Sequence, residues 1–98
     1  MEEEKRQLII DLYDLYGLLL TDKQREYFED YYFMDLSITE MAENYGISRN
    51  GIHDQLKRTV IALESYEEKL HLYTKIKKID SMEMDLELKD RILSLLKE

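Results

Sequence analysis

The 98-residue sequence contains no cysteine, no proline and no tryptophan, and it has only three glycines. Without cysteine, the chain can form no disulfide, no cysteine-ligated zinc site and no reactive thiolate. Without proline, the commonest interruption of a helix is absent, and so few glycines leave few positions where the backbone turns easily at positive φ. We therefore predict an all-α protein, whose 44% hydrophobic composition suffices for a single core.

Long apolar runs are absent too. No stretch approaches the ~18 apolar residues that a membrane-spanning helix needs. The charged segment Met1-Glu-Glu-Glu-Lys-Arg lacks the apolar stretch of a secretory signal. These features predict a cytoplasmic protein with no membrane span.

The formal net charge of -8 argues against a general affinity for nucleic acids, so the distribution of the charges matters more than their sum. Residues 1–20, 21–47 and 79–98 are each net negative. Residues 48–78 differ, because they carry seven basic and four acidic side chains. Any contact with a nucleic acid is therefore expected from this third segment.

Two helices are predicted in the first third of the chain. Apolar residues recur at three- and four-residue steps over residues 6–16, and Gly17 is placed to end that helix in a left-handed conformation. Thr21 and Gln24 have the spacing of a capping box, which predicts a second helix running to about Asp35. Its four aromatic residues have helical spacing, which indicates core packing rather than base stacking. They are Tyr27, Phe28, Tyr31 and Tyr32.

The middle of the chain has the pattern of a helix-turn-helix. Ser37 and Glu40 form a second capping box, and the short helix that they open ends at Gly46. After a three-residue turn, Ser48 can cap a fourth helix. Two capped helices joined by a glycine-containing turn predict a helix-turn-helix at about residues 37–63.

This region resembles region 4 of bacterial sigma factors. Over residues 20–63, a Gln-Arg-Glu triplet opens a helix, a Leu-Ser pair precedes the supporting helix, and Gly-Ile-Ser leads into the recognition helix. With Lys57-Arg58-Thr59 and Leu63-Glu64 added, the chain looks like a member of the YlxM-type family of sigma-like helix-turn-helix proteins. That family is encoded beside the genes of the signal recognition particle GTPases, which implies a regulatory or accessory role in that pathway.

The start of the fourth helix supplies the candidate nucleic-acid-binding residues. Arg49 is suited to guanine O6 and N7, and Asn50 to adenine N6 and N7. Lys57 and Arg58 lie a turn deeper, where phosphates are the expected targets. Asp54, which lies among the candidate residues, repels phosphate. An ordinary solvated surface therefore remains an open alternative. The full set is Ser48, Arg49, Asn50, His53, Lys57 and Arg58.

The fourth helix is expected to extend well beyond the helix-turn-helix. Leu56, Leu63 and Leu70 recur every seven residues, and no glycine or proline occurs before Asp80. These features predict a helix of about 30 residues, ~45 Å long. Within a single domain spanning residues 1–98, such a helix projects beyond the small core.

A last helix, capped by Asp80 or Ser81, offers a cover for the projecting apolar stripe. It either folds back on its own chain or packs against a second copy, and we favour a homodimer that pairs through residues 64–98. Its apolar face consists of Leu88, Ile92, Leu95 and Leu96.

Nothing in the sequence suggests an enzyme. His53 and His71 are too few for a metal site, and the acidic pairs have no glycine-rich loop, nucleophile or catalytic histidine nearby. We expect no cofactor, no bound metal and no catalytic residue. Two functions remain open: a regulator that binds DNA or signal recognition particle RNA, and an adaptor that binds signal recognition particle proteins and uses the helix-turn-helix only as a scaffold.

Overall fold

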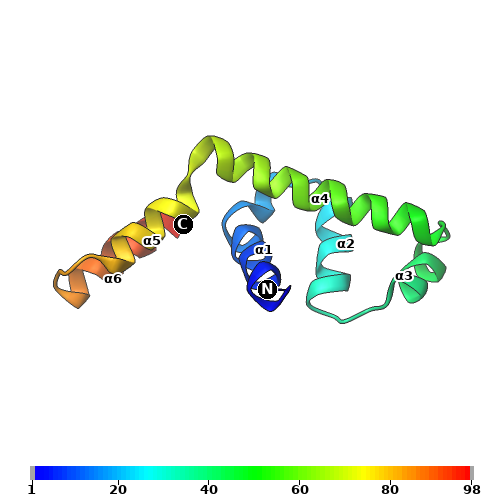
Figure 1. Cartoon of the computed structure of the whole chain (residues 1–98), viewed down its shortest axis with the longest axis horizontal. Coiled ribbons are helices and arrows are strands. Elements are labelled where there is room, and N and C mark those ends of the chain that lie inside the picture. The colour runs from blue at the N-terminus through cyan, green and yellow to red at the C-terminus, as the bar shows by residue number, and fades with distance from the viewer. Residues whose placement is uncertain (1, 98) are drawn as a thin grey trace.

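The computed structural model describes residues 2–97, where every regular element is a helix (Figure 1). The all-α prediction is confirmed. The first four α-helices and η1 form a body, residues 2–70, from which the last two project as a hairpin, residues 72–97. The elements are α1 (Glu2–Tyr16), the 3-10 helix η1 (Gly17–Leu19), α2 (Asp22–Tyr32), α3 (Ile38–Tyr45), α4 (Arg49–Leu70), α5 (Leu72–Ser81) and α6 (Leu86–Lys97).

Both predicted capping boxes are present. The Thr21 hydroxyl accepts from the Gln24 amide at 3.1 Å, and the Gln24 side chain accepts from the Thr21 amide at 3.0 Å. Ser37 and Glu40 make the same reciprocal pair at 3.0 and 3.1 Å. These bonds satisfy amides that have no partner inside the helix, and they fix where α2 and α3 begin.

The core consists of two clusters that share α4. One lies between α1, α2 and the second half of α4, and it contains Ile9, Leu12, Tyr16, Leu20, Phe28 and Leu63. The other lies between α2, α3 and the first half of α4, and it contains Tyr27, Met41, Ile52 and Leu56. Because α4 contributes to both clusters, it holds the helix-turn-helix and the N-terminal helices in one arrangement.

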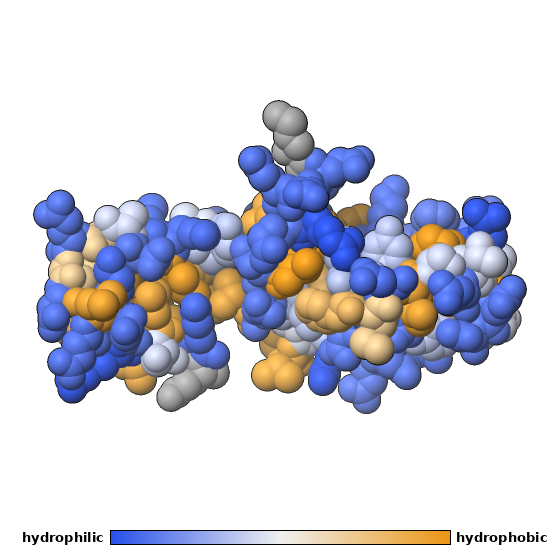
Figure 2. Space-filling view, turned by 90° about the horizontal axis from the view of Figure 1, so that it is seen from below, coloured by the Kyte–Doolittle hydropathy of each residue, from blue (hydrophilic) through white to orange (hydrophobic). Residues whose placement is uncertain are grey.

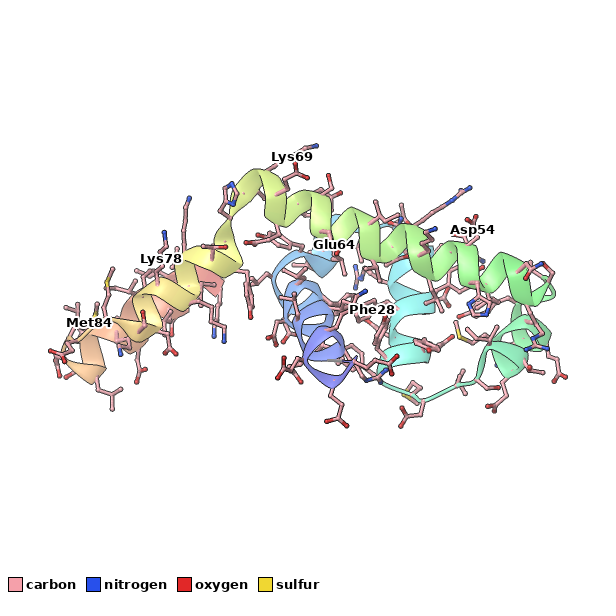
Figure 3. All side chains as sticks on the ribbon, viewed as in Figure 1. Phe28, Asp54, Glu64, Lys69, Lys78 and Met84 are labelled. Carbon is pink, nitrogen blue, oxygen red and sulfur yellow. The ribbon has the colours of Figure 1, made fainter. Side chains whose placement is uncertain are left out.

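The aromatic residues of α2 pack in this core as predicted. Phe28 is fully buried between α1 and α2 (Figure 3), where its ring stacks on Tyr13 with the centroids 4.2 Å apart. Tyr27 is buried as well, and Tyr31 and Tyr32 are half-buried. Core packing therefore accounts for the aromatic density of this helix.

Two predicted features at helix ends are wrong. Gly17 has no positive φ; it opens η1, and a β-carbon at this position would lie 3.2 Å from the Tyr13 ring, so close packing explains the glycine. Helix α2 ends at Tyr32 and does not reach Asp35, because Asp35 itself adopts φ +56° in the connection to α3.

The fourth helix extends past the helix-turn-helix as predicted, but it ends at Leu70 after 22 residues and not after about 30. His71 breaks it in a left-handed conformation, φ +55°, and α5 starts at the next residue. The break is stabilised by Glu67, whose carboxylate accepts from the amides of Tyr73 and Thr74 at 2.9 and 3.2 Å. The His71 side chain makes no capping hydrogen bond to α5. The Glu67 carboxylate, from the last turn of α4, therefore caps the N-terminus of α5 in its place.

The predicted start of the last helix is also wrong. Asp80 and Ser81 belong to the end of α5, and α6 begins at Leu86. Helix α6 does fold back along α5, and the Lys89 ammonium donates to the Asp80 carbonyl at 2.8 Å (Figure 1). Pairing with a second copy stays a prediction.

Candidate nucleic-acid interface

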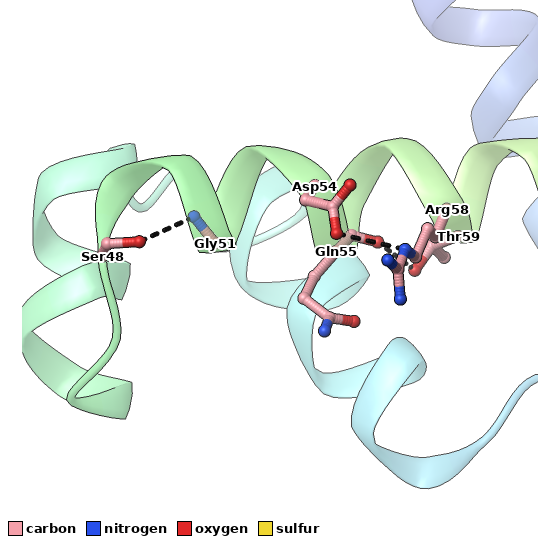
Figure 4. Close-up of polar contacts among 6 residues, drawn as sticks. All are labelled: Ser48, Gly51, Asp54, Gln55, Arg58 and Thr59. Carbon is pink, nitrogen blue, oxygen red and sulfur yellow. Dashed lines mark hydrogen bonds and ion pairs between the residues drawn. The ribbon is translucent and has the colours of Figure 1, made fainter.

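The helix-turn-helix consists of α3, the turn at residues 46–48, and the first half of α4. Gly46 ends α3 with φ +67°, a left-handed conformation that glycine adopts without steric cost. Ser48 then caps α4, since its hydroxyl accepts from the Gly51 amide at 3.0 Å (Figure 4). Met41 and Ile52 are fully buried where the two helices meet.

A phenol–carboxylate contact fixes the supporting helix α3 in place. The Tyr45 hydroxyl donates to the Asp30 carboxylate of α2, and the Tyr45 ring packs edge-on against Tyr27. Burial, followed by the bond to Asp30, raises the pKa of Tyr45. The phenol therefore stays neutral and keeps donating, which holds α3 and its turn against α2.

All six candidate residues are exposed. Their four-residue spacing along α4 divides five of them between two stripes. One stripe, which we call the basic stripe, contains Arg49, His53 and Lys57 and has no acidic member. The other, which we call the mixed stripe, contains Asn50, Asp54 and Arg58. The sixth candidate, Ser48, precedes both and has its hydroxyl oxygen engaged as the cap.

Within the mixed stripe, Arg58 is paired. Its Nε lies 3.1 Å from a carboxylate oxygen of Asp54, and both side chains are more than half exposed (Figure 4). Asp54 points away from the body, as Figure 3 shows. The charge of Arg58 is thus locally offset, and it is a weaker candidate for a phosphate contact than Lys57.

The basic stripe borders an open groove of about 690 Å³ between α4 and the N-terminal part of α1. His53 and Lys57 line one side, and Lys5 and Arg6 line the other. The groove also carries Glu2, Glu3 and Glu64 and the half-buried rings of Tyr31 and Tyr32.

Arg6 is held rigidly beside the groove. Its guanidinium donates to the Tyr32 carbonyl at 3.0 Å and lies over the Tyr32 ring, 5.0 Å from the centroid. Lys5 and Arg6 were not predicted from the sequence, because they belong to a net negative segment and only the folding of α1 against α4 brings them near the recognition helix. The adjacent Lys5-Arg6 pair was the one sequence signal that could have found them.

Between residues 2 and 97, histidines and carboxylates form no cluster of three that could hold a metal ion. None of the helices described combines the length and the apolar composition needed to cross a membrane. The exposed half of α4 is thus the best-defined candidate surface.

Comparison with known proteins gives a family match over nearly the whole chain. Residues 3–97 match the family UPF0122, described as "Putative helix-turn-helix protein, YlxM / p13 like". A UPF0122 protein of Lactococcus lactis subsp. cremoris is 51% identical over 74 residues, which cover 76% of this chain and 67% of that protein. The UPF0122 protein YofM of Lactococcus lactis subsp. lactis gives the same values. A Streptococcus pneumoniae UPF0122 protein is 49% identical over the same length and coverage.

Proposed function

Because this chain belongs to the UPF0122 family of YlxM- and p13-like helix-turn-helix proteins, we propose that it is a cytoplasmic regulatory protein that binds nucleic acid and is not an enzyme. The observation that carries the proposal is the basic stripe. Arg49, His53 and Lys57 are exposed on the recognition helix of a protein whose net charge is -8.

Each residue of the recognition helix has a distinct role in the proposed complex. Arg49 and Asn50 lie in the first turn of α4, where a recognition helix presents side chains to base edges in the major groove. Lys57 reaches phosphate two turns further on, and His53 lies between them. Ser48 places the positive end of the α4 dipole toward a phosphate. Arg58 contributes when it separates from Asp54.

Binding in this mode calls for two copies. Each basic contact with a phosphate contributes about -0.9 to the slope of the logarithm of the binding constant against the logarithm of the salt concentration. With about three such contacts, one chain gains little electrostatic binding energy. A homodimer doubles the contacts and presents two recognition helices to two half-sites. We therefore include a homodimer, paired through residues 64–98, in the proposed function.

The proposed targets are DNA and signal recognition particle RNA. The second target follows from the resemblance to YlxM-type proteins, which associates the chain with the signal recognition particle pathway. A second candidate function is an adaptor for proteins of that pathway. It is favoured by the net charge of -8, which suits basic partners, and by the groove beside α4, where charges of both signs surround apolar and aromatic side chains.

A binding titration at two salt concentrations separates these functions. We expect affinity for duplex DNA or for signal recognition particle RNA to fall with salt, and to fall further in Arg49→Ala and Lys57→Ala. Lys23→Ala is the matched control, because it removes an equal charge from an exposed position on α2. Absence of binding at low salt, with retained capture of the particle GTPase, would overturn the nucleic-acid proposal in favour of the adaptor.

A further inference from the structure

The projecting hairpin has no core of its own. Helices α5 and α6 contain no buried residue, although α6 is rich in leucine. Leu95 and Leu86 are each 69% exposed, Met82 is 50% exposed and Leu88 is 49% exposed. Figure 2 shows this apolar surface on the hairpin, at the left of the view, among charged side chains.

This apolar surface is continuous along one side of α6. Leu88 and Leu95 are seven residues apart, so they lie on the same side of the helix, and Ile92 lies between them on the adjoining turn. Leu93 and Leu96, the remaining leucines of this half of α6, are only half-buried. Two helices alone cannot enclose such a surface, whereas four helices enclose one routinely.

The hairpin is also polarised along its length. Residues 80–88, at its tip, carry four acidic side chains and no basic one. Residues 72–78, on the half of α5 nearer the body, carry three lysines and no acidic side chain, and residues 89–97, which return toward the body, carry three basic residues and one acidic residue. The tip is therefore negative and the base positive.

Two of these basic residues lie close to acidic side chains of the body. Lys77 and Lys97 line a cavity of about 250 Å³ together with Asp11 and Asp14 of α1. Lys75 and Lys78 are exposed and do not line that cavity. These two lysines are therefore accessible to an acidic surface of another molecule.

We propose that the partner of this surface is the hairpin of a second copy, packed side by side and antiparallel about a two-fold axis. In that arrangement the acidic tip of each copy lies against the basic base of the other, and four helices enclose the leucines. Charge complementarity identifies a second copy as the partner. A two-fold axis places the tip of each hairpin beside the base of the other, and these two ends carry opposite charges. This pairing deepens the homodimer of the proposed function, and it narrows residues 64–98 to the hairpin.

The mass in solution, measured by light scattering over a range of protein concentrations, tests the pairing. We expect the wild-type chain to approach twice its 11.9 kDa monomer mass. Leu88→Glu and Leu95→Glu should each weaken self-association at least about tenfold. Leu18→Glu is the control, because Leu18 is 86% exposed but lies on η1, outside the hairpin. Circular dichroism of each variant establishes that its helices are intact.

Charge reversal tests the antiparallel order. The pair Glu83→Lys and Asp85→Lys makes the tip basic, and Lys75→Glu and Lys78→Glu makes the base acidic. Each double variant alone should be monomeric, and an equimolar mixture should form a heterodimer in which both tip–base contacts are matched. Wild-type protein that stays at 11.9 kDa, or double variants that do not combine, would overturn the pairing. A monomer that still binds nucleic acid overturns only the pairing, and a dimer that binds none overturns only the nucleic-acid proposal.

Discussion

The hydroxyl of Tyr16 donates to the carboxylate of Glu67 at 2.6 Å, across 51 residues of sequence. The same phenol accepts from the Leu72 amide at 3.1 Å, and the same carboxylate accepts from the Thr74 hydroxyl at 2.9 Å. Tyr16 is fully buried in the first core cluster. The break between α4 and α5 is therefore fastened to the centre of the body through this pair.

Replacing Glu67 is expected to loosen the break. Glu67→Ala removes the acceptor for the Tyr16 hydroxyl and for the first amides of α5, and we expect the free energy of unfolding to fall by about 1–3 kcal/mol in urea denaturation. The neighbouring Glu68→Ala removes an exposed carboxylate of the same charge and should change stability by less than about 0.5 kcal/mol. Equal losses in the two variants would contradict a specific role for Glu67.

The Glu67 carboxylate is also expected to make the stability of the fold depend on pH. Burial raises its pKa, but the hydrogen bonds from Tyr16, Tyr73 and Thr74 outweigh burial and leave the pKa below its ordinary value. A carboxylate whose pKa is lower in the folded chain than in the unfolded chain stabilises the native state at any pH above the unfolded-state pKa. This stabilisation is lost as the pH falls through the folded-state pKa. The difference in melting temperature between wild type and Glu67→Gln should therefore be largest near neutral pH and shrink in acid. A difference that grows as the pH falls would contradict this assignment.

The ion pair on the recognition helix gives a prediction that rests on the proposed function. Asp54→Asn removes a repulsive carboxylate and releases Arg58, whose Nε lies 3.1 Å from it. We expect tighter binding to nucleic acid, and a salt dependence steeper by up to about 0.9, as fluorescence anisotropy at several salt concentrations would show. Glu68→Gln removes the same charge further along α4 and serves as the control. Equal gains in both variants would mean that only net charge matters.

Gly46 allows a clean test of backbone strain in the turn. Its φ is +67°, and a β-carbon added there would meet no atom within 4 Å. Gly46→Ala should therefore destabilise the fold by about 1–2 kcal/mol through its left-handed conformation alone. Gly46→Asn should cost less, because asparagine tolerates that conformation better. Thermal unfolding of the two variants compares them directly, and an alanine variant as stable as wild type would show that the turn adopts another conformation in solution.

The features predicted well from sequence are those whose causes are local. Each capping box joins residues three apart, and Gly46 acts on its own φ, so the helix-turn-helix and the exposure of Arg49 follow from short-range chemistry. The break at His71 does not follow from short-range chemistry. The apolar repeat of Leu56, Leu63 and Leu70 continues through it, and what stabilises the break is a tyrosine 51 residues before Glu67. A contact over that distance leaves no periodic signal.

For the candidate site, too, the sequence predicted the local features and not the long-range ones. The candidate residues lie exposed on one helix, because helical spacing determines which side chains share a face. The sequence also placed Asp54 among them, but only the geometry shows that it pairs with Arg58. The groove with Lys5 and Arg6 depends on the packing of α1 against α4, which no local pattern specifies.

The break between α4 and α5 depends on the torsions of one residue, His71. A change of those torsions re-aims the hairpin and shifts Leu72 and Tyr73, which pack against the first core cluster, but it leaves the apolar surface of α6 unaltered. In a paired molecule, the separation of the two recognition helices would then vary independently of how tightly the copies associate. In the proposed dimer, the joint at His71 therefore sets the length of target that the two recognition helices span.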